Sequence, residues 1–75
     1  MNKILVPLEE ITNEDLIECY HLSCSLSGYD YTMDFDSTLS MANHWFKYGG
    51  KENIANVPEL LNLIYSKGYF IPDKI

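Results

Sequence analysis

Apolar residues recur at helical spacing in three separate segments of the chain. In the first of these, residues 13–27, the apolar stripe consists of Leu16, Ile17, Tyr20 and Cys24. Thr12 and Asp15 form a loose capping box at its start, and Gly28 is a typical helix stop. The pattern therefore predicts a helix over residues 13–27.

The second segment, residues 37–48, is apolar around much of its circumference. Its two neighbouring apolar faces consist of Leu39, Ala42 and Phe46 and of Met41, Trp45 and Tyr48. Asp36 or Ser37 can cap such a helix, and the glycine pair 49–50 can end it. A helix of this kind is either well buried or meets a partner with one of its faces.

The third segment begins with good initiation chemistry. Asn56 is a suitable cap, Pro58 is tolerated in the first turn, and Glu59 occupies the third position. The apolar stripe that follows consists of Val57, Leu60, Leu61 and Ile64. Lys67 suits the negative end of the helix dipole, and Gly68 is a typical stop, so a helix is predicted between Asn56 and Gly68.

The two ends of the chain contain short β-branched or aromatic runs, residues 3–6 and 69–71, each followed by a proline. They can pair as a small ribbon that depends on the helices for its stability. Residues 30–36 alternate polar and apolar, which predicts an extended connection with Tyr31, Met33 and Phe35 pointing inward. The expected fold is mainly α: a compact three-helix single domain over residues 1–75, with a short two-stranded β ribbon joining the termini.

Charge changes this picture, because acidic residues are concentrated in one part of the chain. The protein has 75 residues, 11 acids, 5 lysines and no arginine, with a net charge of −6. No lysine or arginine occurs between residues 4 and 46, which contain the acids Glu9, Glu10, Glu14, Asp15, Glu18, Asp30, Asp34 and Asp36. So few scattered lysines argue against direct nucleic-acid binding, which needs clustered basic residues.

An acidic face of this kind can be explained by solubility alone, or by a basic partner that it attracts. The functional hypothesis is a non-enzymatic protein that inhibits or modulates a larger, basic-surfaced, nucleic-acid-handling protein. Tyrosine and tryptophan beside the acids favour protein contact. The predicted partner-binding residues are Glu10, Glu14, Asp15, Glu18, Tyr29, Asp30, Tyr31, Asp34, Asp36, Trp45 and Tyr48.

Two further hypotheses use other features. The apolar second helix would suit a small subunit or antitoxin-like partner that works as an obligate homo- or hetero-oligomer, including a homodimer. Zinc binding would draw on Cys19, His21, Cys24 and His44, but their spacing is not that of a structural zinc site. The run from Asp34 lacks the glycine and glutamate of a calcium loop.

No motif for catalysis accompanies these residues, and so short a chain has little room for an enclosed substrate pocket. Residue type alone does not exclude a cysteine nucleophile activated by a histidine base. We expect no enzyme activity, no metal, no cofactor and two reduced thiols. The longest uncharged stretch is too polar for a membrane span, so a soluble, cytoplasmic protein without a membrane partner is expected. The acidic, arginine-free composition, rich in asparagine and tyrosine, is typical of small phage or mobile-element proteins that act on host or defence proteins.

Overall fold

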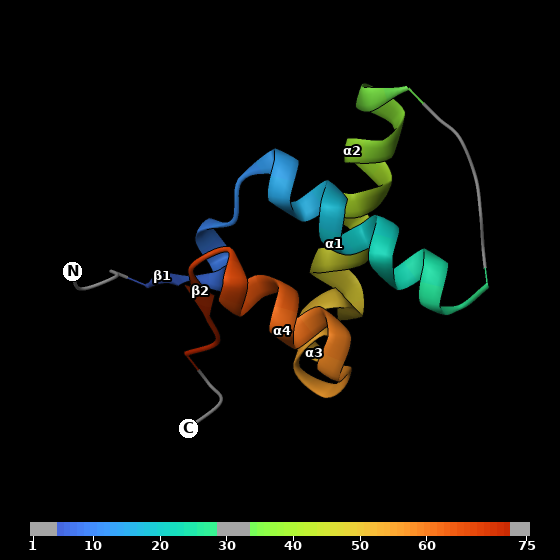
Figure 1. The fold of residues 1–75 in the computed structure, drawn as a ribbon. Coiled ribbons are helices and arrows are strands. Elements are labelled where there is room, and N and C mark those ends of the chain that lie inside the picture. Colours follow the sequence, from blue (N-terminus) through green and yellow to red (C-terminus); the bar gives the residue numbers. More distant parts are fainter. Residues whose placement is uncertain (1–4, 29–33, 73–75) are drawn as a thin grey trace.

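Four α-helices make up most of the computed structural model, which describes residues 5–28 and 34–72. The helices are α1 (Asn13–Leu26), α2 (Phe35–Trp45), α3 (Lys51–Asn56) and α4 (Pro58–Ser66). Helix α2 stands against α1, and α3 and α4 lie on the other side of α1 (Figure 1). The predicted mainly helical fold is confirmed, and α3 is a short additional helix that precedes α4 directly.

The two ends of the described chain meet in a small parallel sheet. Strand β1 (Val6–Pro7) pairs with β2 (Tyr69–Phe70), with Val6 opposite Tyr69 and Pro7 opposite Phe70 (Figure 1). A single turn of 3₁₀ helix, η1 (Leu8–Glu10), follows β1 and buries Leu8 completely. The predicted ribbon is confirmed, although β1 begins later than expected and includes Pro7.

Helix α1 starts and stops where its capping residues indicate. The Thr12 hydroxyl oxygen accepts a hydrogen bond from the Asp15 backbone N–H at 3.3 Å. At the other end, Gly28 has a φ of +77°, a left-handed conformation that glycine adopts without a side-chain clash. The helix ends at Leu26, one residue before the predicted end.

Helix α2 begins two residues earlier than predicted. Its cap is Asp34, whose carboxylate accepts hydrogen bonds from the Ser37 backbone N–H at 3.0 Å and from the Ser37 hydroxyl at 2.8 Å. The predicted cap at Asp36 or Ser37 is therefore wrong. Phe35 lies in the first turn and is 52% exposed, so its predicted inward orientation on an extended segment is also wrong. Tyr31 and Met33 lie outside the described residues.

The glycine pair redirects the chain between α2 and α3. The segment η2 (Phe46–Gly50) leaves helical geometry at Tyr48, with a φ of −113° and a ψ of 42°, and Gly49 has a φ of +130°. A Cβ at Gly50 would lie 2.9 Å from both the Trp45 ring and the Trp45 carbonyl oxygen. Only glycine allows the chain to turn this close to Trp45.

Helix α4 has no side-chain cap, because Asn56 belongs to the last turn of α3. The N-cap is Val57, with extended backbone angles of −108° and 113°, and Pro58 follows it. The predicted cap at Asn56 is therefore wrong. Gly68 has a φ of +95° and its N–H bonds to the Tyr65 carbonyl at 3.1 Å, as expected for a helix stop.

Two buried clusters form the core. The larger one consists of Leu8, Cys19, Ile54, Leu60, Ile64 and Tyr69, and the smaller one of Leu16, Tyr20 and Ala42. Ile11, Trp45 and Phe46 pack against both clusters and join them. Helix α1 therefore contributes to both, with α4 on one side and α2 on the other. Among the described residues, no helix combines the length and apolar character that crossing a membrane requires.

Candidate functional site

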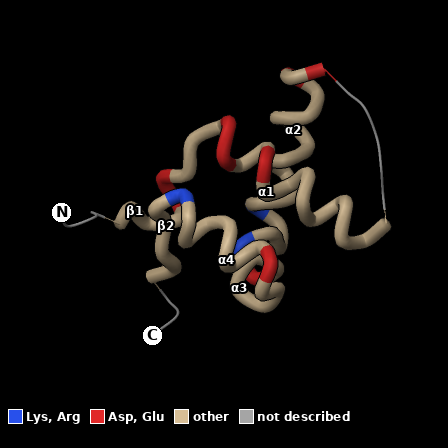
Figure 2. Tube along the Cα trace, in the orientation of Figure 1, with Lys and Arg blue, Asp and Glu red and all other residues tan. Residues whose placement is uncertain are grey.

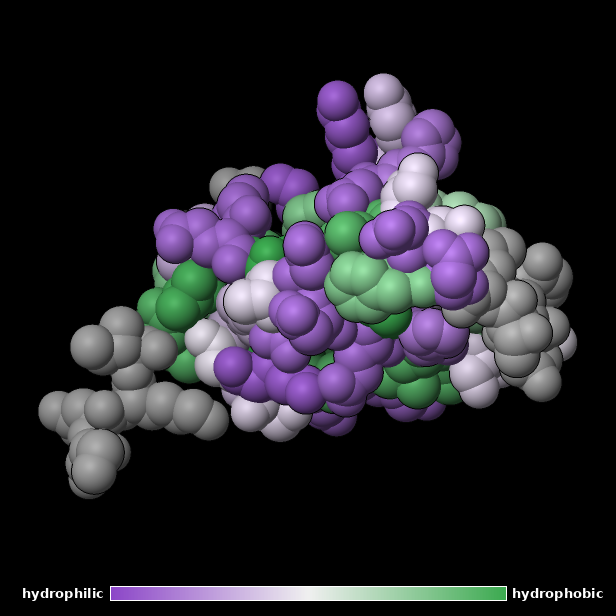
Figure 3. All heavy atoms as spheres, turned by 90° about the horizontal axis from the view of Figure 1, so that it is seen from above, coloured by the Kyte–Doolittle hydropathy of each residue, from purple (hydrophilic) through white to green (hydrophobic). Residues whose placement is uncertain are grey.

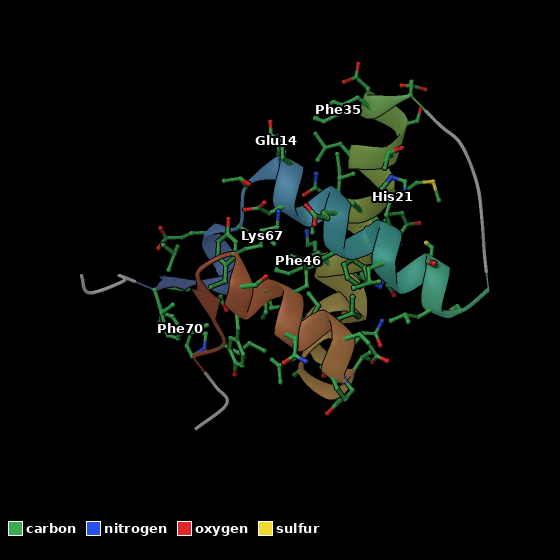
Figure 4. All side chains as sticks on the ribbon, in the orientation of Figure 1. Glu14, His21, Phe35, Phe46, Lys67 and Phe70 are labelled. Carbon is green, nitrogen blue, oxygen red and sulfur yellow. The ribbon has the colours of Figure 1, made fainter. Side chains whose placement is uncertain are left out.

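Lysines of the C-terminal half form ion pairs with several acids of the N-terminal half. Lys51 Nζ lies 3.0 Å from Glu9 Oε2. Lys67 extends from the end of α4 toward α1, where its Nζ lies 2.7 Å from Glu18 Oε1 and 3.6 Å from Asp15 Oδ1 (Figure 4). Glu9, Asp15 and Glu18 therefore have cationic partners in the fold, although no lysine lies near them in the sequence.

The pKa values of these groups follow from the same contacts. The hydrogen bond from Lys51 lowers the pKa of the Glu9 carboxyl, and the hydrogen bond to Glu18 raises the pKa of the Lys67 ammonium. Each shift favours the charged form of the group. Both pairs are exposed enough for solvent to weaken them, so each contributes little to the stability of the fold.

A buried tyrosine completes the contact between α1 and the end of the chain. Tyr69, 5% exposed, donates its hydroxyl hydrogen to Asp15 Oδ2 at 2.7 Å and accepts the Thr12 backbone N–H at 3.2 Å. We name this group the terminal clamp; it consists of Thr12, Asp15, Glu18, Lys67 and Tyr69. Its acids are engaged within the protein, which leaves them less able to attract a partner.

Other predicted acids have no such partner among the described residues. Glu10, Glu14 and Asp36 are exposed and form no ion pair with any residue in 5–28 or 34–72. The hydrogen bonds from Ser37 lower the pKa of Asp34, which is therefore ionised at neutral pH. Acidic positions follow the upper side of α1 and the free end of α2, whereas those of α3 and α4 lie below (Figure 2). Tyr29, Asp30 and Tyr31 lie outside the described residues.

A hollow of about 560 Å³ lies between α1 and α2 and opens widely to solvent. Its lining consists of Tyr20, Ser40, Met41, His44, Trp45 and Tyr48, and we name it the α2 hollow. The rings of Tyr20 and Trp45 lie at its inner side, with centroids 5.5 Å apart and planes inclined by 52°. Four of the lining residues are exposed, namely Ser40, Met41, His44 and Tyr48, and Met41 and Tyr48 have 37% and 69% of their surface accessible.

Helical spacing explains why these side chains share one side. Ser40, His44 and Tyr48 are four residues apart and follow one row along α2 and η2, with the His44 and Tyr48 rings 4.7 Å apart. Asp36 continues the same row one turn toward the N-terminus. Gly50 packs closely against the Trp45 ring and leaves it little room to move. The α2 hollow therefore has an aromatic end at Tyr48, whereas Asp36 lies one turn beyond Ser40 and outside the lining.

The cysteines and histidines form no comparable site. Cys19 is 1% exposed, and burial, followed by the charges of Glu18 and Asp15, raises the pKa of its thiol to about 11. Such a thiol is protonated at neutral pH and is a poor nucleophile. Cys24 is a half-buried free thiol. Within residues 5–28 and 34–72, no three His, Cys, Asp or Glu side chains are grouped as metal ligands would be.

The structure brings together only part of the predicted partner surface. Trp45 and Tyr48 line one hollow and Asp36 lies one turn beyond Ser40, outside that lining, whereas Asp15 and Glu18 belong to the terminal clamp. Glu14 lies near the start of α1 and points outward (Figure 4). The lining residues that the sequence did not single out as partner-binding are Tyr20, Ser40, Met41 and His44. The four-residue spacing from Asp36 to Tyr48 is the signal that could have identified two of them, Ser40 and His44.

Comparison with known proteins adds no relative: no family model, curated protein or solved structure matches this chain.

Proposed function

We propose that this protein is a non-enzymatic binding protein that inhibits or modulates a larger, basic-surfaced protein through the α2 hollow and the acidic end of α2. The observation that carries this proposal is the combination, on one helix, of an aromatic hollow and of carboxylates that form no ion pair with a lysine of residues 5–28 or 34–72. Neither feature alone would favour a protein partner over a solvated surface.

The exposed apolar side chains of α2 support a protein contact. Phe35, Met41 and Tyr48 are 52%, 37% and 69% exposed along this helix and its extension. Tyrosine, tryptophan and methionine are enriched at the centres of protein interfaces, where their apolar surface leaves water. From above, the molecule presents mostly hydrophilic side chains with several hydrophobic areas among them (Figure 3). That arrangement is typical of an apolar contact surrounded by a polar rim.

The charge of the protein supports a basic partner. The net charge is −6, and two of the acids, Asp34 and Asp36, lie at the N-terminal end of α2. Such charges accelerate association with a positive surface and do so less at high salt. Basic surfaces on larger proteins commonly bind nucleic acid, so occupation by this protein would block them. The small, acidic, arginine-free chain fits a phage or mobile-element protein that acts in this way.

The test uses a photo-reactive amino acid placed at position 48, in the cells that make the protein. Position 65 is the control, because Tyr65 is 45% exposed on α4 and does not line the α2 hollow. We expect position 48 to yield one prominent adduct with a larger protein that has a basic surface. The purified partner should then bind either this protein or nucleic acid, and not both together.

Charge variants sharpen the test. Asp34→Asn with Asp36→Asn removes two charges while asparagine still caps α2. Glu52→Gln with Glu59→Gln removes the same number of charges from α3 and α4 and is the matched control. The first pair should reduce the adduct strongly and the second should leave it. An adduct only with a second copy of the chain would instead support the oligomer alternative, and equal adducts at positions 48 and 65 would overturn the proposal.

A further inference from the structure

The side of α2 that points away from α1 is exposed from its first turn to its last. Ala42 is fully buried in the cluster that α2 shares with α1, and it marks the side on which the two helices pack (Figure 1). On the other side, exposed residues recur every three or four positions. We name these residues the outer row; it consists of Asp36, Ser40, Asn43 and Lys47.

Opposite charges lie at the two ends of the outer row. Asp36 is in the first turn of α2, and Lys47 follows eleven residues later, where the backbone is still helical, because helical geometry ends at Tyr48. Eleven residues make about three turns, so the two side chains project from the same side of the helix about 16 Å apart, too far to pair with each other. Neither forms an ion pair with any residue in 5–28 or 34–72.

Lys47 has one weak contact within the chain. Its Nζ lies 5.7 Å from the centroid of the Tyr48 ring, near the outer limit of a cation–π interaction. Lys47 and Tyr48 are both exposed, so this lysine can turn toward a carboxylate outside the chain at little cost. The outer row therefore offers one negative and one positive group to a partner.

A second copy of the chain, placed antiparallel, is complementary to the outer row. With a two-fold axis between Met41 and Ala42, Asp36 of each copy lies opposite Lys47 of the other, because both residues are equally far from the axis. A parallel copy would place like charges opposite each other. The row thus matches itself in the antiparallel orientation alone.

The side chains between the charged ends suit two helices at close distance. Ser40 of each copy lies opposite Asn43 of the other, and both side chains are short enough for the two backbones to approach. Met41, 37% exposed, lies beside the axis, so the Met41 side chains of the two copies can meet there. Methionine adapts its shape readily to such a contact.

We infer that the outer row of α2 is the interface of a weak antiparallel homodimer, joined at its two ends by contacts between Asp36 and Lys47. This inference goes beyond the proposed function and does not depend on it. Ser40 belongs both to the outer row and to the lining of the α2 hollow. Self-association would therefore compete with a larger partner for the same helix.

The dimer is measured by sedimentation velocity of the full chain from about 10 µM to about 1 mM. One face of a short helix buries less than the roughly 800 Å² per partner of a stable interface, so we expect a Kd on the order of 100 µM. Asp36→Lys places a lysine opposite Lys47, and Lys47→Glu places a glutamate opposite Asp36. Each variant alone should dimerise at least about 10-fold more weakly, because both ends of the interface then repel.

An equimolar mixture of the two variants is the decisive measurement. In the mixed pair, the introduced lysine faces the introduced glutamate at one end, and Asp36 faces Lys47 at the other. Association should return to within about 3-fold of the wild-type Kd, since the ends attract again. The mixed pair carries the same total charge as two wild-type chains, so net charge cannot account for the recovery.

Glu59→Lys is the matched control, because it makes the same change of charge in the first turn of α4. It should not weaken the dimer, and circular dichroism confirms that the helices persist in each variant. A monomer up to about 1 mM would overturn the inference. An unchanged Kd in Asp36→Lys, equal weakening by Glu59→Lys, or no recovery in the mixture would also overturn it.

The outcomes distinguish this inference from the proposed function. If the chain stays monomeric while position 48 forms an adduct with a larger basic protein, the dimer is wrong and the binding function stands. If the charge variants behave as expected but no adduct with a larger protein forms, the dimer stands and the proposed function is wrong.

Discussion

Two tyrosines show how differently two regions of this small protein use the same residue types. Tyr69 in the terminal clamp is 5% exposed, and its hydroxyl is engaged by Asp15 and by the Thr12 backbone. Tyr48 in the α2 hollow is 69% exposed, and its ring meets His44 and Lys47 at the surface. Tyr69 connects distant segments of the fold, whereas Tyr48 is accessible to a partner.

The acids divide in the same way. Asp15 and Glu18 face Lys67 in the terminal clamp, whereas Asp36 in the first turn of α2 has no ion pair among the described residues. An acidic residue that is paired within the fold contributes little to attraction of a partner. The difference indicates that local pairing, rather than the total charge of −6, decides which acids can act at a docking surface.

The largest expected effect on the free energy of unfolding comes from truncating a buried side chain near the terminal clamp. Truncating an exposed side chain of the α2 hollow is the comparison. Ile64, which packs in the core cluster of Tyr69, is 0% exposed, whereas Met41 is 37% exposed. Ile64→Ala should lower the free energy of unfolding by about 2–5 kcal/mol and Met41→Ala by less than about 1 kcal/mol. Urea unfolding measures both.

So small a domain has a free energy of unfolding of only about 3–5 kcal/mol, and Ile64→Ala can therefore prevent folding. Ile64→Val supplies the milder variant, with an expected cost of about 0.5–1.5 kcal/mol. A cost for Met41→Ala as large as that of Ile64→Ala would mean that the α2 hollow is part of the core, and the comparison between the two regions would fail.

The two tyrosines give the next test. Tyr69→Phe removes one hydroxyl and leaves the Thr12 N–H and the Asp15 carboxylate without it, so the free energy of unfolding should fall by about 1–3 kcal/mol. Tyr48→Phe should change it by no more than about 0.5 kcal/mol, because that hydroxyl lies at the surface. Thermal and urea unfolding of both variants check this prediction, and equal effects would contradict it.

Much of the fold could be predicted because local signals determine where helices begin and end. Thr12, Gly28 and Gly68 act as their residue types indicate. Asp34, Asp36 and Ser37 can all cap a helix, so the sequence alone could not choose among them. The predicted cap at Asn56 was wrong for another reason. Asn56 is a suitable capping residue, but α3 extends through it, and the extended backbone of Val57 separates α3 from α4.

The candidate site was harder to predict, because it depends on contacts between distant segments. The pair Glu9–Lys51 spans 42 residues and Tyr69–Asp15 spans 54, and neither spacing has a sequence signature. Trp45 and Tyr48 could be predicted from the second apolar face of their helix. Tyr20 was assigned to the core stripe, and it does lie there with 8% of its surface exposed, yet that remaining surface lines the α2 hollow.

The two cysteines allow the same comparison between the two regions, measured by the reactivity of their thiols. Cys19 packs in the core cluster of Tyr69, whereas Cys24 packs half-buried against the cluster of Tyr20. In the folded protein, Ellman's reagent should modify Cys24 and should reach Cys19 only on unfolding, because burial keeps that thiol protonated and covered. Cys24→Ala should then leave a folded protein that reacts slowly, and rapid modification of this variant would contradict the prediction.

Cys19 also predicts an effect of alkaline pH. Burial raises the pKa of its thiol from an ordinary value near 9 to about 11. A raised pKa in the folded state stabilises the fold below pH 9, and this stabilisation is lost as the pH rises from about 9 to about 11. The decline in the free energy of unfolding over that range should be smaller in Cys19→Ala than in the Cys24→Ala control.

The smallest expected effect concerns Asp34. This residue lies on the same helix as the α2 hollow and also caps that helix through its hydrogen bonds with Ser37. Hydrogen bonds from Ser37 lower its pKa, so they stabilise the first turn of α2 at neutral pH, and this stabilisation is lost as the pH falls through the lowered pKa. Asp34→Asn keeps a cap without a titrating group and should remove this acid-dependent loss of helical circular dichroism between about pH 5 and 2, whereas Asp34→Ala should lose helix signal at every pH. If Asp34→Asn behaves like Asp34→Ala, the charge of Asp34 is needed for folding itself. Asp34 would then resemble Asp15 in the terminal clamp more than its neighbour Asp36, and the acidic end of α2 would be reduced to Asp36 alone.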